Sequence, residues 1–225
     1  MFRLFLFVVL LLPVSLSGQS FEIYGGFNRN HFNTRRYIAP EPVLKHANQL
    51  EARDGFAIGL AVYDLKVVNN WKPWFALQFE QYSGWFDLRG SEGQTLNFVK
   101  GEITRSVLQM SLYPLDITYW KVLRTSVGLQ LGTRLNEQVN GLRGVLGSGI
   151  DIEESFSQNT PKGLEWYGGL VARMALEIKC HENWWIVPQY TAYIGLSNEL
   201  AAYPYDTPIR AFRQLGAIGI KKRFD

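Results

Sequence analysis

The chain of 225 residues has a single cysteine and only three histidines. One thiol cannot form an internal disulfide, so a fold held by disulfide bridges is excluded. Beyond the first 20 residues no apolar run exceeds about nine residues, whereas a membrane-spanning helix needs about 20. Basic and acidic residues number 23 and 20 and are mixed along the chain. This distribution lacks the basic stripe of a nucleic-acid binder, so no nucleic acid is expected as a partner.

The first 18 residues have the pattern of a secretory signal peptide. Arg3 supplies a positive charge, residues 4–12 form an apolar core, and residues 13–18 are small or polar. We expect cleavage near Gly18, so that residues 19–225 form one exported domain. We expect no cofactor in this domain, and no cluster of metal-ligating residues is evident in its sequence.

Downstream of the signal, hydrophobic residues alternate with polar or small residues with a period of two. Phe21, Ile23 and Phe27 share one face of the first segment, whereas Glu22 and Tyr24 share the other. Eight alternating segments of this kind predict the strands of an antiparallel barrel. They cover residues 21–28, 56–63, 75–80, 107–112, 127–134, 169–178, 186–197 and 212–224.

A soluble barrel turns its apolar face inward, whereas a membrane barrel turns that face outward to lipid. Two features favour the membrane form. The faces opposite the apolar rows carry charges of both signs together with many glycines. The segments between strands also alternate in length: residues 33–54, 83–95, 136–162 and 199–208 are long or polar, and residues 66–70, 114–121 and 179–183 are short. A soluble, lipocalin-like ligand carrier is the alternative.

A third feature is the collection of aromatic residues at the strand ends. Two aromatic girdles at headgroup level are typical of barrels in lipid. On the short-turn side the predicted girdle comprises Trp71, Trp74, Trp120, Trp184, Trp185 and Phe224. The three features together predict an eight-stranded antiparallel up-and-down transmembrane β-barrel with short periplasmic turns and longer extracellular loops. Its expected location is the outer membrane of a Gram-negative-type bacterium, in contact with outer-membrane lipid.

Eight strands leave an interior just wide enough for side chains. The inward faces carry five charged residues that we expect to form a polar network in this lumen: Glu80, Arg134, Arg173, Glu177 and Arg213. Our hypothesis is that Arg173 and Arg213 pair with Glu80 and Glu177 and block diffusion through the barrel. The alternative is that some of these side chains reach water at the rims.

Three stretches resemble the small PorT-like outer-membrane β-barrel proteins: the glycine-bearing first strand, residues 190–198 (YTAYIGLSN) and the final residues 214–224 (QLGAIGIKKRF). The resemblance implies a non-catalytic structural or accessory subunit of an outer-membrane protein-secretion or assembly complex, with protein partners there. The final strand departs from the pattern in two respects: Asp225 follows the aromatic Phe224, and Lys222 occupies an outward register where an aromatic or aliphatic residue is expected.

Two long loops carry apolar residues that favour contact with such a partner. They are Tyr37 and Ile38 in the first loop, and Val145, Leu146 and Ile150 in the third. The competing function is a lipid-modifying enzyme of the lipid A deacylase or acyltransferase type. That chemistry needs a histidine beside a serine or an acid, and His31 at the outer end of the first strand is its candidate.

Overall fold

The computed structural model describes residues 19–34, 49–64, 72–92, 95–146, 152–160, 166–197 and 209–224. The predicted signal peptide, residues 1–18, lies outside the described residues. No helix among the described residues is long and apolar enough to cross a bilayer. The strands are β1 (Ser20–Thr34), β2 (Gln49–Tyr63), β3 (Trp74–Glu92), β4 (Thr95–Tyr119), β5 (Leu123–Leu146), β6 (Ile152–Thr160), β7 (Trp166–Leu176), β8 (Ile178–His181), β9 (Trp184–Gly195) and β10 (Ile209–Arg223).

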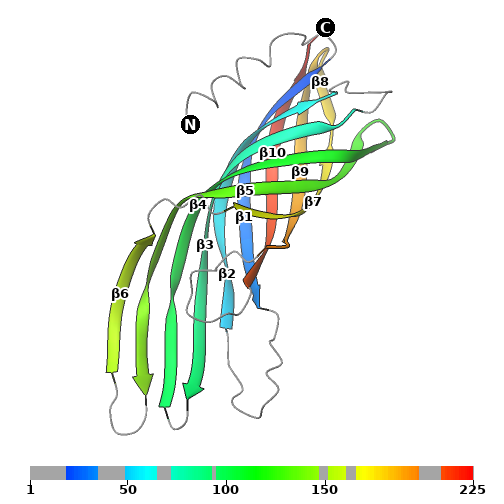
Figure 1. Ribbon diagram of the computed structural model, residues 1–225. Coiled ribbons are helices and arrows are strands. Elements are labelled where there is room, and N and C mark those ends of the chain that lie inside the picture. Colours follow the sequence, from blue (N-terminus) through cyan, green and yellow to red (C-terminus); the bar gives the residue numbers. More distant parts are fainter. Residues whose placement is uncertain are drawn as a thin grey trace.

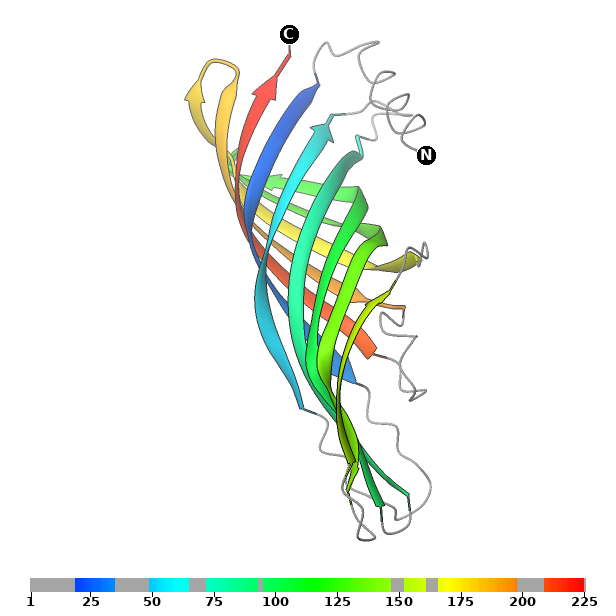
Figure 2. The ribbon, with the colours of Figure 1, turned by 90° about the vertical axis from the view of Figure 1, so that its left-hand side faces the viewer.

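Eight of these strands close into a ring in the order β1, β2, β3, β4, β5, β7, β9 and β10. Closure is made by β10, which pairs antiparallel with β9 on one side and with β1 on the other. β8 continues β7 beyond Glu177, and β6 pairs with β5 above the ring. The predicted eight-stranded antiparallel barrel is therefore confirmed, and its walls are visible in Figures 1 and 2.

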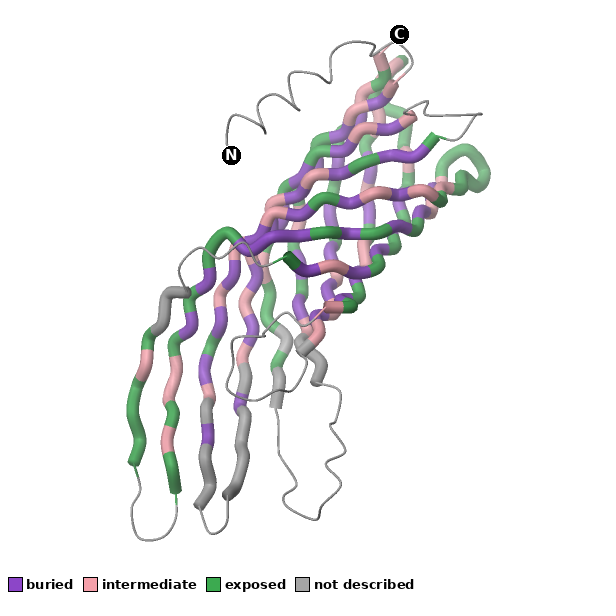
Figure 3. Tube along the Cα trace, viewed as in Figure 1, coloured by how far each residue is buried: buried purple, intermediate pink, exposed green. Residues whose placement is uncertain are grey.

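The apolar rows face away from the barrel axis. Leu129 and Ile218 are 55% and 64% exposed, whereas Glu22 and Gln109 on the opposite faces are almost completely buried. Figure 3 shows this alternation of buried and exposed residues along the strands of the ring. An apolar outer wall around a polar interior is the arrangement of a transmembrane barrel, and it excludes the lipocalin-like alternative, whose lumen is apolar.

Inward glycines make room for inward tyrosines. A Cβ atom added to Gly132 would lie 2.2 Å from the ring of Tyr167, and one added to Gly59 would lie 2.3 Å from the ring of Tyr24. An added Cβ on the outward Gly216 would meet no atom within 4 Å. The glycines thus thin the inner wall at the places where large side chains cross the narrow lumen.

The described structure corrects the predicted loops over residues 83–95 and 136–162. β3 and β4 stay paired up to Glu92 and Thr95, and β5 runs on to Leu146 and pairs with β6. β4 and β5 pass a bulge at Ser106/Val107, and beyond it their backbones stay paired as far as Leu96 and Leu146. The parts of β3, β4 and β5 beyond the ring, together with β6, therefore form a sheet that projects past the outer end of the barrel. It comprises residues 83–92, 95–106, 136–146 and 152–160, is called the raised sheet below, and lies at the lower left of Figure 1.

The opposite end of the barrel, called the turn rim below, holds Ser20, Arg223 and the tight turns after β4 and β8. The predicted turn over residues 114–121 is shorter than expected. β4 passes a bulge between Leu112 and Leu115 and ends only at Tyr119. Trp120 and Lys121 then adopt positive φ angles of 50° and 61° in the hairpin turn to β5.

The apolar outer wall predicts how a charged substitution halfway along the barrel changes the free energy of unfolding. Leu129→Arg places a guanidinium among outward apolar residues, and we expect a loss of about 2–4 kcal/mol in the free energy of unfolding from lipid vesicles. Urea titration of protein folded into vesicles measures this value.

Leu146→Arg on the same strand is the matched control, because Leu146 lies in the raised sheet. We expect a change within about 0.5 kcal/mol there. Equal effects of the two substitutions would contradict a lipid-facing position for Leu129.

Candidate functional site in the barrel lumen

The lumen is filled by charged and amide side chains together with buried aromatic and small apolar residues. The charged and amide residues on the inward face of β5 are all buried. From the turn rim toward the outer end they are Arg124, Gln130, Arg134 and Glu137. Charges taken out of water need partners at hydrogen-bond distance, because their desolvation is otherwise strongly unfavourable. The ion pairs that the described residues form inside the lumen fall into four successive groups along the barrel.

The group at the turn rim is centred on two carboxylates. Glu177 accepts a hydrogen bond from the Lys221 ammonium at 2.8 Å and another from Arg124 at 3.2 Å. Arg124 also donates through Nε to Asp116 at 2.9 Å, and Ser126 donates to the same carboxylate at 2.7 Å. These contacts join β4, β5, β10 and the link between β7 and β8 across the end of the lumen.

The second group contains a carboxylate that is fully buried. Glu22 on β1 pairs with the Arg173 guanidinium of β7 at 3.0 Å and accepts hydrogen bonds from Gln189 at 2.9 Å and from the Tyr63 hydroxyl. Arg173 also donates to Gln189, and its guanidinium carbon lies 4.9 Å from the ring centre of Trp74. This ion pair spans the barrel, because β1 and β7 are not neighbours in the ring.

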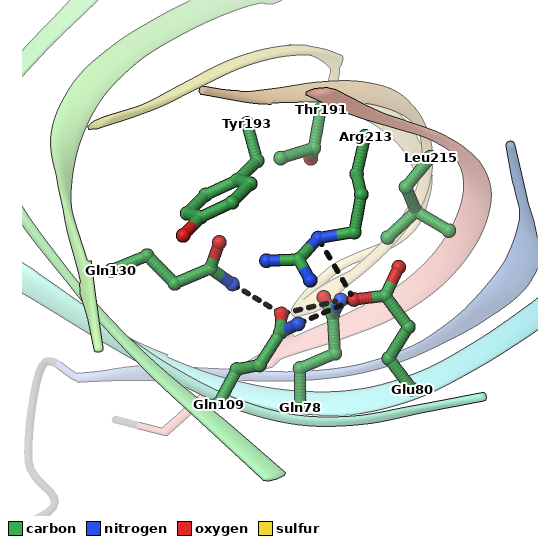
Figure 4. A pocket seen from close by; sticks show the side chains of 8 residues that line it. All are labelled: Gln78, Glu80, Gln109, Gln130, Thr191, Tyr193, Arg213 and Leu215. Atoms are coloured by element: carbon green, nitrogen blue, oxygen red, sulfur yellow. Dashed lines mark hydrogen bonds and ion pairs between the residues drawn. The ribbon is translucent and has the colours of Figure 1, made fainter. Parts of the chain in front are cut away.

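The third group lies at mid-barrel (Figure 4). Glu80 accepts hydrogen bonds from Asn28 at 2.7 Å and from Gln109, and the Arg213 guanidinium lies 3.7 Å from it. Gln130 donates to Gln109. These side chains border a cavity of about 10 Å³, which is the space of a single water molecule.

The fourth group lies nearer the outer end. Glu137 is almost completely buried and pairs with Arg105 and, at 3.0 Å, with Arg134. Above mid-barrel, Arg213 sits among tyrosine rings, with its guanidinium carbon 4.0 Å from the ring centre of Tyr193. Ion pairs and rings of this kind occupy the described lumen from the turn rim to its outer end.

The structure brings the five predicted lumen residues together with different partners than expected. Arg213 lies beside Glu80 as predicted. Arg173 pairs with Glu22 instead of Glu80 or Glu177, and Glu177 pairs with Arg124 and Lys221. These partners lie on strands that are distant in the sequence, so their pairing depends on strand tilt and register, which alternation does not reveal.

Sequence reasoning missed Glu137, the acidic partner of Arg134, and Arg105, which pairs with the same carboxylate. Arg105 continues the inward face of β4, since it is two residues before Val107 and four before Gln109. Counting by two from Gln109 would have found Arg105. Glu137 is different, because the bulge at Ser106/Val107 changes which residues of β5 face inward above Arg134.

The predicted aromatic girdle needs two corrections, at Trp74 and at Trp185, which pairs with the buried Lys221 in the inward register of β9. Trp120 and Trp184 are exposed at 84% and 39%, and Trp185 and Phe224 are half-buried at the same rim. Trp74 is wrong as a girdle residue, because it begins β3 in the inward register and is only 1% exposed, with its ring stacked 3.7 Å from that of Tyr113. Trp71 lies outside the described residues.

The remaining candidates lie at the outer end. His31 is half-buried, and its ring centre lies 6.2 Å from that of Phe212. Val145 and Leu146 are exposed at the end of β5 in the raised sheet. Tyr37, Ile38 and Ile150 lie outside the described residues. In the part of the chain that is described, no group of three or more His, Cys, Asp or Glu side chains is arranged to hold a metal ion.

No protein-family model and no curated protein matches the chain. Among solved structures it is similar to Neisserial surface protein A (TM-score 0.41, 11% identity, 92% of this chain and 100% of that one). It is also similar to Ail, the attachment invasion locus protein of Yersinia pestis (TM-score 0.39, 13% identity, 91% and 99%). A third is the outer membrane protein OprG from Pseudomonas aeruginosa (TM-score 0.38, 14% identity, 92% and 97%). Likeness at this level assigns no function to the chain.

The buried ion pair between Glu22 and Arg173 yields a stability prediction. Glu22→Gln keeps the shape of the side chain and leaves the Arg173 charge without its carboxylate. We expect a loss of about 3–5 kcal/mol in the free energy of unfolding, measured by urea titration in vesicles.

The matched control is Glu154→Gln, which removes the exposed partner of Arg143 at 2.8 Å. An exposed pair contributes at most about 1 kcal/mol, so this variant should unfold almost as the parent does. A loss for Glu22→Gln no larger than for the control would show that the buried pair does not stabilise the lumen.

Proposed function

We propose that the protein is a non-catalytic, integral outer-membrane barrel that does not conduct solutes and serves as an accessory subunit of a secretion or assembly complex. The filled lumen carries this proposal, because paired charges and amides leave a mid-barrel cavity of only about 10 Å³. A barrel without a path through its centre acts through its outer wall and its ends.

The outer wall supports a membrane location. Outward residues such as Leu129, Ile194 and Ile218 are more than half exposed, and burying apolar surface of this kind in hydrocarbon is strongly favourable. The predicted signal peptide and the PorT-like pattern of residues 190–198 and 214–224 agree with an exported barrel that works in a complex.

The raised sheet supplies the proposed contact surface. Its tip exposes Val145, Leu146 and Ile152, of which Ile152 is 57% exposed. Its charged residues are paired across strands, including Arg143 with Glu154 at 2.8 Å and Lys100 with Glu153 at 3.6 Å. A paired sheet whose described end exposes apolar side chains is suited to contact another protein.

A closed lumen predicts the electrical behaviour of the purified protein. In planar bilayers we expect no steady unitary currents above the baseline, because the ion pairs around Glu80 and Arg173 block the path. A general porin inserted under the same conditions serves as the positive control. Large, steady currents from the intact protein would refute the closed lumen.

Trimming the raised sheet tests the contact surface. Replacing residues 141–156 by Asn-Gly closes a short hairpin above the paired residues Asn140 and Ser157. We expect the shortened chain to fold and to lose the proteins that co-purify with the parent in mild detergent. Heat-dependent migration on gels verifies that the barrel is folded.

A parent chain that elutes alone would refute the subunit proposal. An unchanged set of partners on a folded, trimmed barrel would instead place the contact elsewhere than on this hairpin.

A further inference from the structure

The raised sheet ends in a strand that has a neighbour on one side only. β6 pairs antiparallel with β5 along all nine of its residues, Ile152–Thr160. In the part of the chain that the structure describes, no strand pairs with the other edge of β6. Figure 1 shows this strand at the outer margin of the raised sheet. The strands of the ring have no such edge at the level of the barrel, because closure gives each of them two neighbours.

The free edge lacks the features that usually keep an exposed strand from pairing. Proteins protect such edges with short strands, prolines, lysines or bulges. β6 (IEESFSQNT) is nine residues long, contains no proline or lysine, and pairs with β5 without a bulge. At about 3.4 Å per residue it presents about 30 Å of backbone, in which every second residue directs its N–H and C=O away from β5.

The acidic side chains of β6 do not guard this edge. Glu154 pairs with Arg143, its direct neighbour on β5, at 2.8 Å. Glu153 pairs with Lys100 of β4 at 3.6 Å. Both carboxylates are therefore neutralised from the interior of the sheet, and β6 offers an incoming strand no uncompensated charge in this part of the described chain.

The inner face of β6 holds the strand in place. Phe156 packs against the buried cluster that includes Tyr82 and Ile103. Ile152 lies on the same face as Phe156 and is 57% exposed, whereas Ser155 on the other face is small and exposed. Because the backbone of β6 is already ordered, a further strand can pair with it at a low cost in conformational entropy.

We propose that the free edge of β6 binds an extended segment of another protein, which adds a strand to the raised sheet. In such an addition the backbone groups supply the hydrogen bonds and the side-chain rows select the sequence. The segment that fits alternates, with apolar residues beside Ile152 and Phe156 and small or polar residues beside Ser155. The inference rests on the contact proposed above for the raised sheet and names the strand that makes it.

A second copy of the chain is not suited to this edge. Two copies in one membrane point the same way, so their β6 strands run in the same direction. They cannot form the antiparallel pair that two-fold symmetry creates between two sheet edges. The occupant is therefore a segment of a different protein.

Hydrogen exchange of the full chain in detergent tests whether the edge is free. About half of the amides of β6 should exchange rapidly, because they point away from β5, and the other half slowly. Mass spectrometry of a fragment that covers residues 152–160 measures the two fractions. Uniform exchange of these amides, whether slow or rapid, would overturn the proposal, since a free edge opposite a paired one requires two classes.

A synthetic peptide with the sequence of residues 137–145 (EQVNGLRGV) serves as the probe strand. This segment of β5 is the antiparallel partner of β6 on its other side, so its alternation matches that of β6. At millimolar concentration the peptide should slow the rapid amides of β6, about four in number. The control is the same peptide with Leu142→Pro, which breaks the strand and should leave exchange unchanged. No protection by the first peptide, or equal protection by both, would overturn the proposal.

Two neighbouring proline variants separate the free edge from the pairing with β5. Glu154→Pro and Ser155→Pro remove adjacent N–H groups, of which one points to β5 and the other to the free edge. We expect one variant to keep the slowly exchanging amides and to bind the probe about tenfold more weakly. The other variant should lose slow exchange instead. Probe binding that neither variant weakens would overturn the proposal.

Co-purification in mild detergent separates this inference from the subunit proposal. Partners lost from the trimmed barrel but kept by both proline variants would refute pairing at the edge and leave the subunit proposal intact. A parent chain that elutes alone and still binds the probe would refute the subunit proposal and support the edge as a binding strand. A dimer of the parent chain that an edge variant abolishes would assign the edge to a second copy and overturn the choice of occupant.

Discussion

The structure depends on the neutralisation of charge inside a narrow barrel. A strand that shows its apolar face to lipid must place its other face in the lumen, and here that face carries Glu22, Glu80, Glu137, Arg173 and Arg213. An isolated charge in such a space is strongly unfavourable, so each carboxylate has a basic partner near it. Because partners such as Glu22 and Arg173 lie on strands that are not adjacent, the ion pairs also tie opposite walls of the barrel together.

The same constraint explains the distribution of glycine and aromatic residues. The lumen accepts the rings of Tyr24 and Tyr167 only because Gly59 and Gly132 have no side chain at the points of contact. Trp74 enters the lumen as well and packs between Tyr113 and the Arg173 guanidinium. Rings that face inward therefore act as fillers and as cation–π partners, and rings that face outward, such as those of Trp120 and Trp184, mark the edge of the apolar wall.

With the centre filled, the two ends and the wall are the surfaces left for function. The outer end extends into the raised sheet, whose cross-strand ion pairs such as that of Arg143 with Glu154 balance its charges locally. At the turn rim, Lys222 lies against the rings of Trp184 and Phe224. A sheet whose charges are paired across strands is suited to contact another protein.

The sequence by itself determined the class of fold. A period of two, with apolar rows opposite charged and glycine-bearing rows, is enough to predict a barrel of eight antiparallel strands, because side chains of a strand alternate between two faces. Only the tertiary structure decided that residues 83–92 and 136–146 extend strands, that Trp74 faces inward and that Arg173 pairs with Glu22. These features depend on bulges, strand tilt and register around a closed ring, which bring together residues that alternation along a single strand cannot relate.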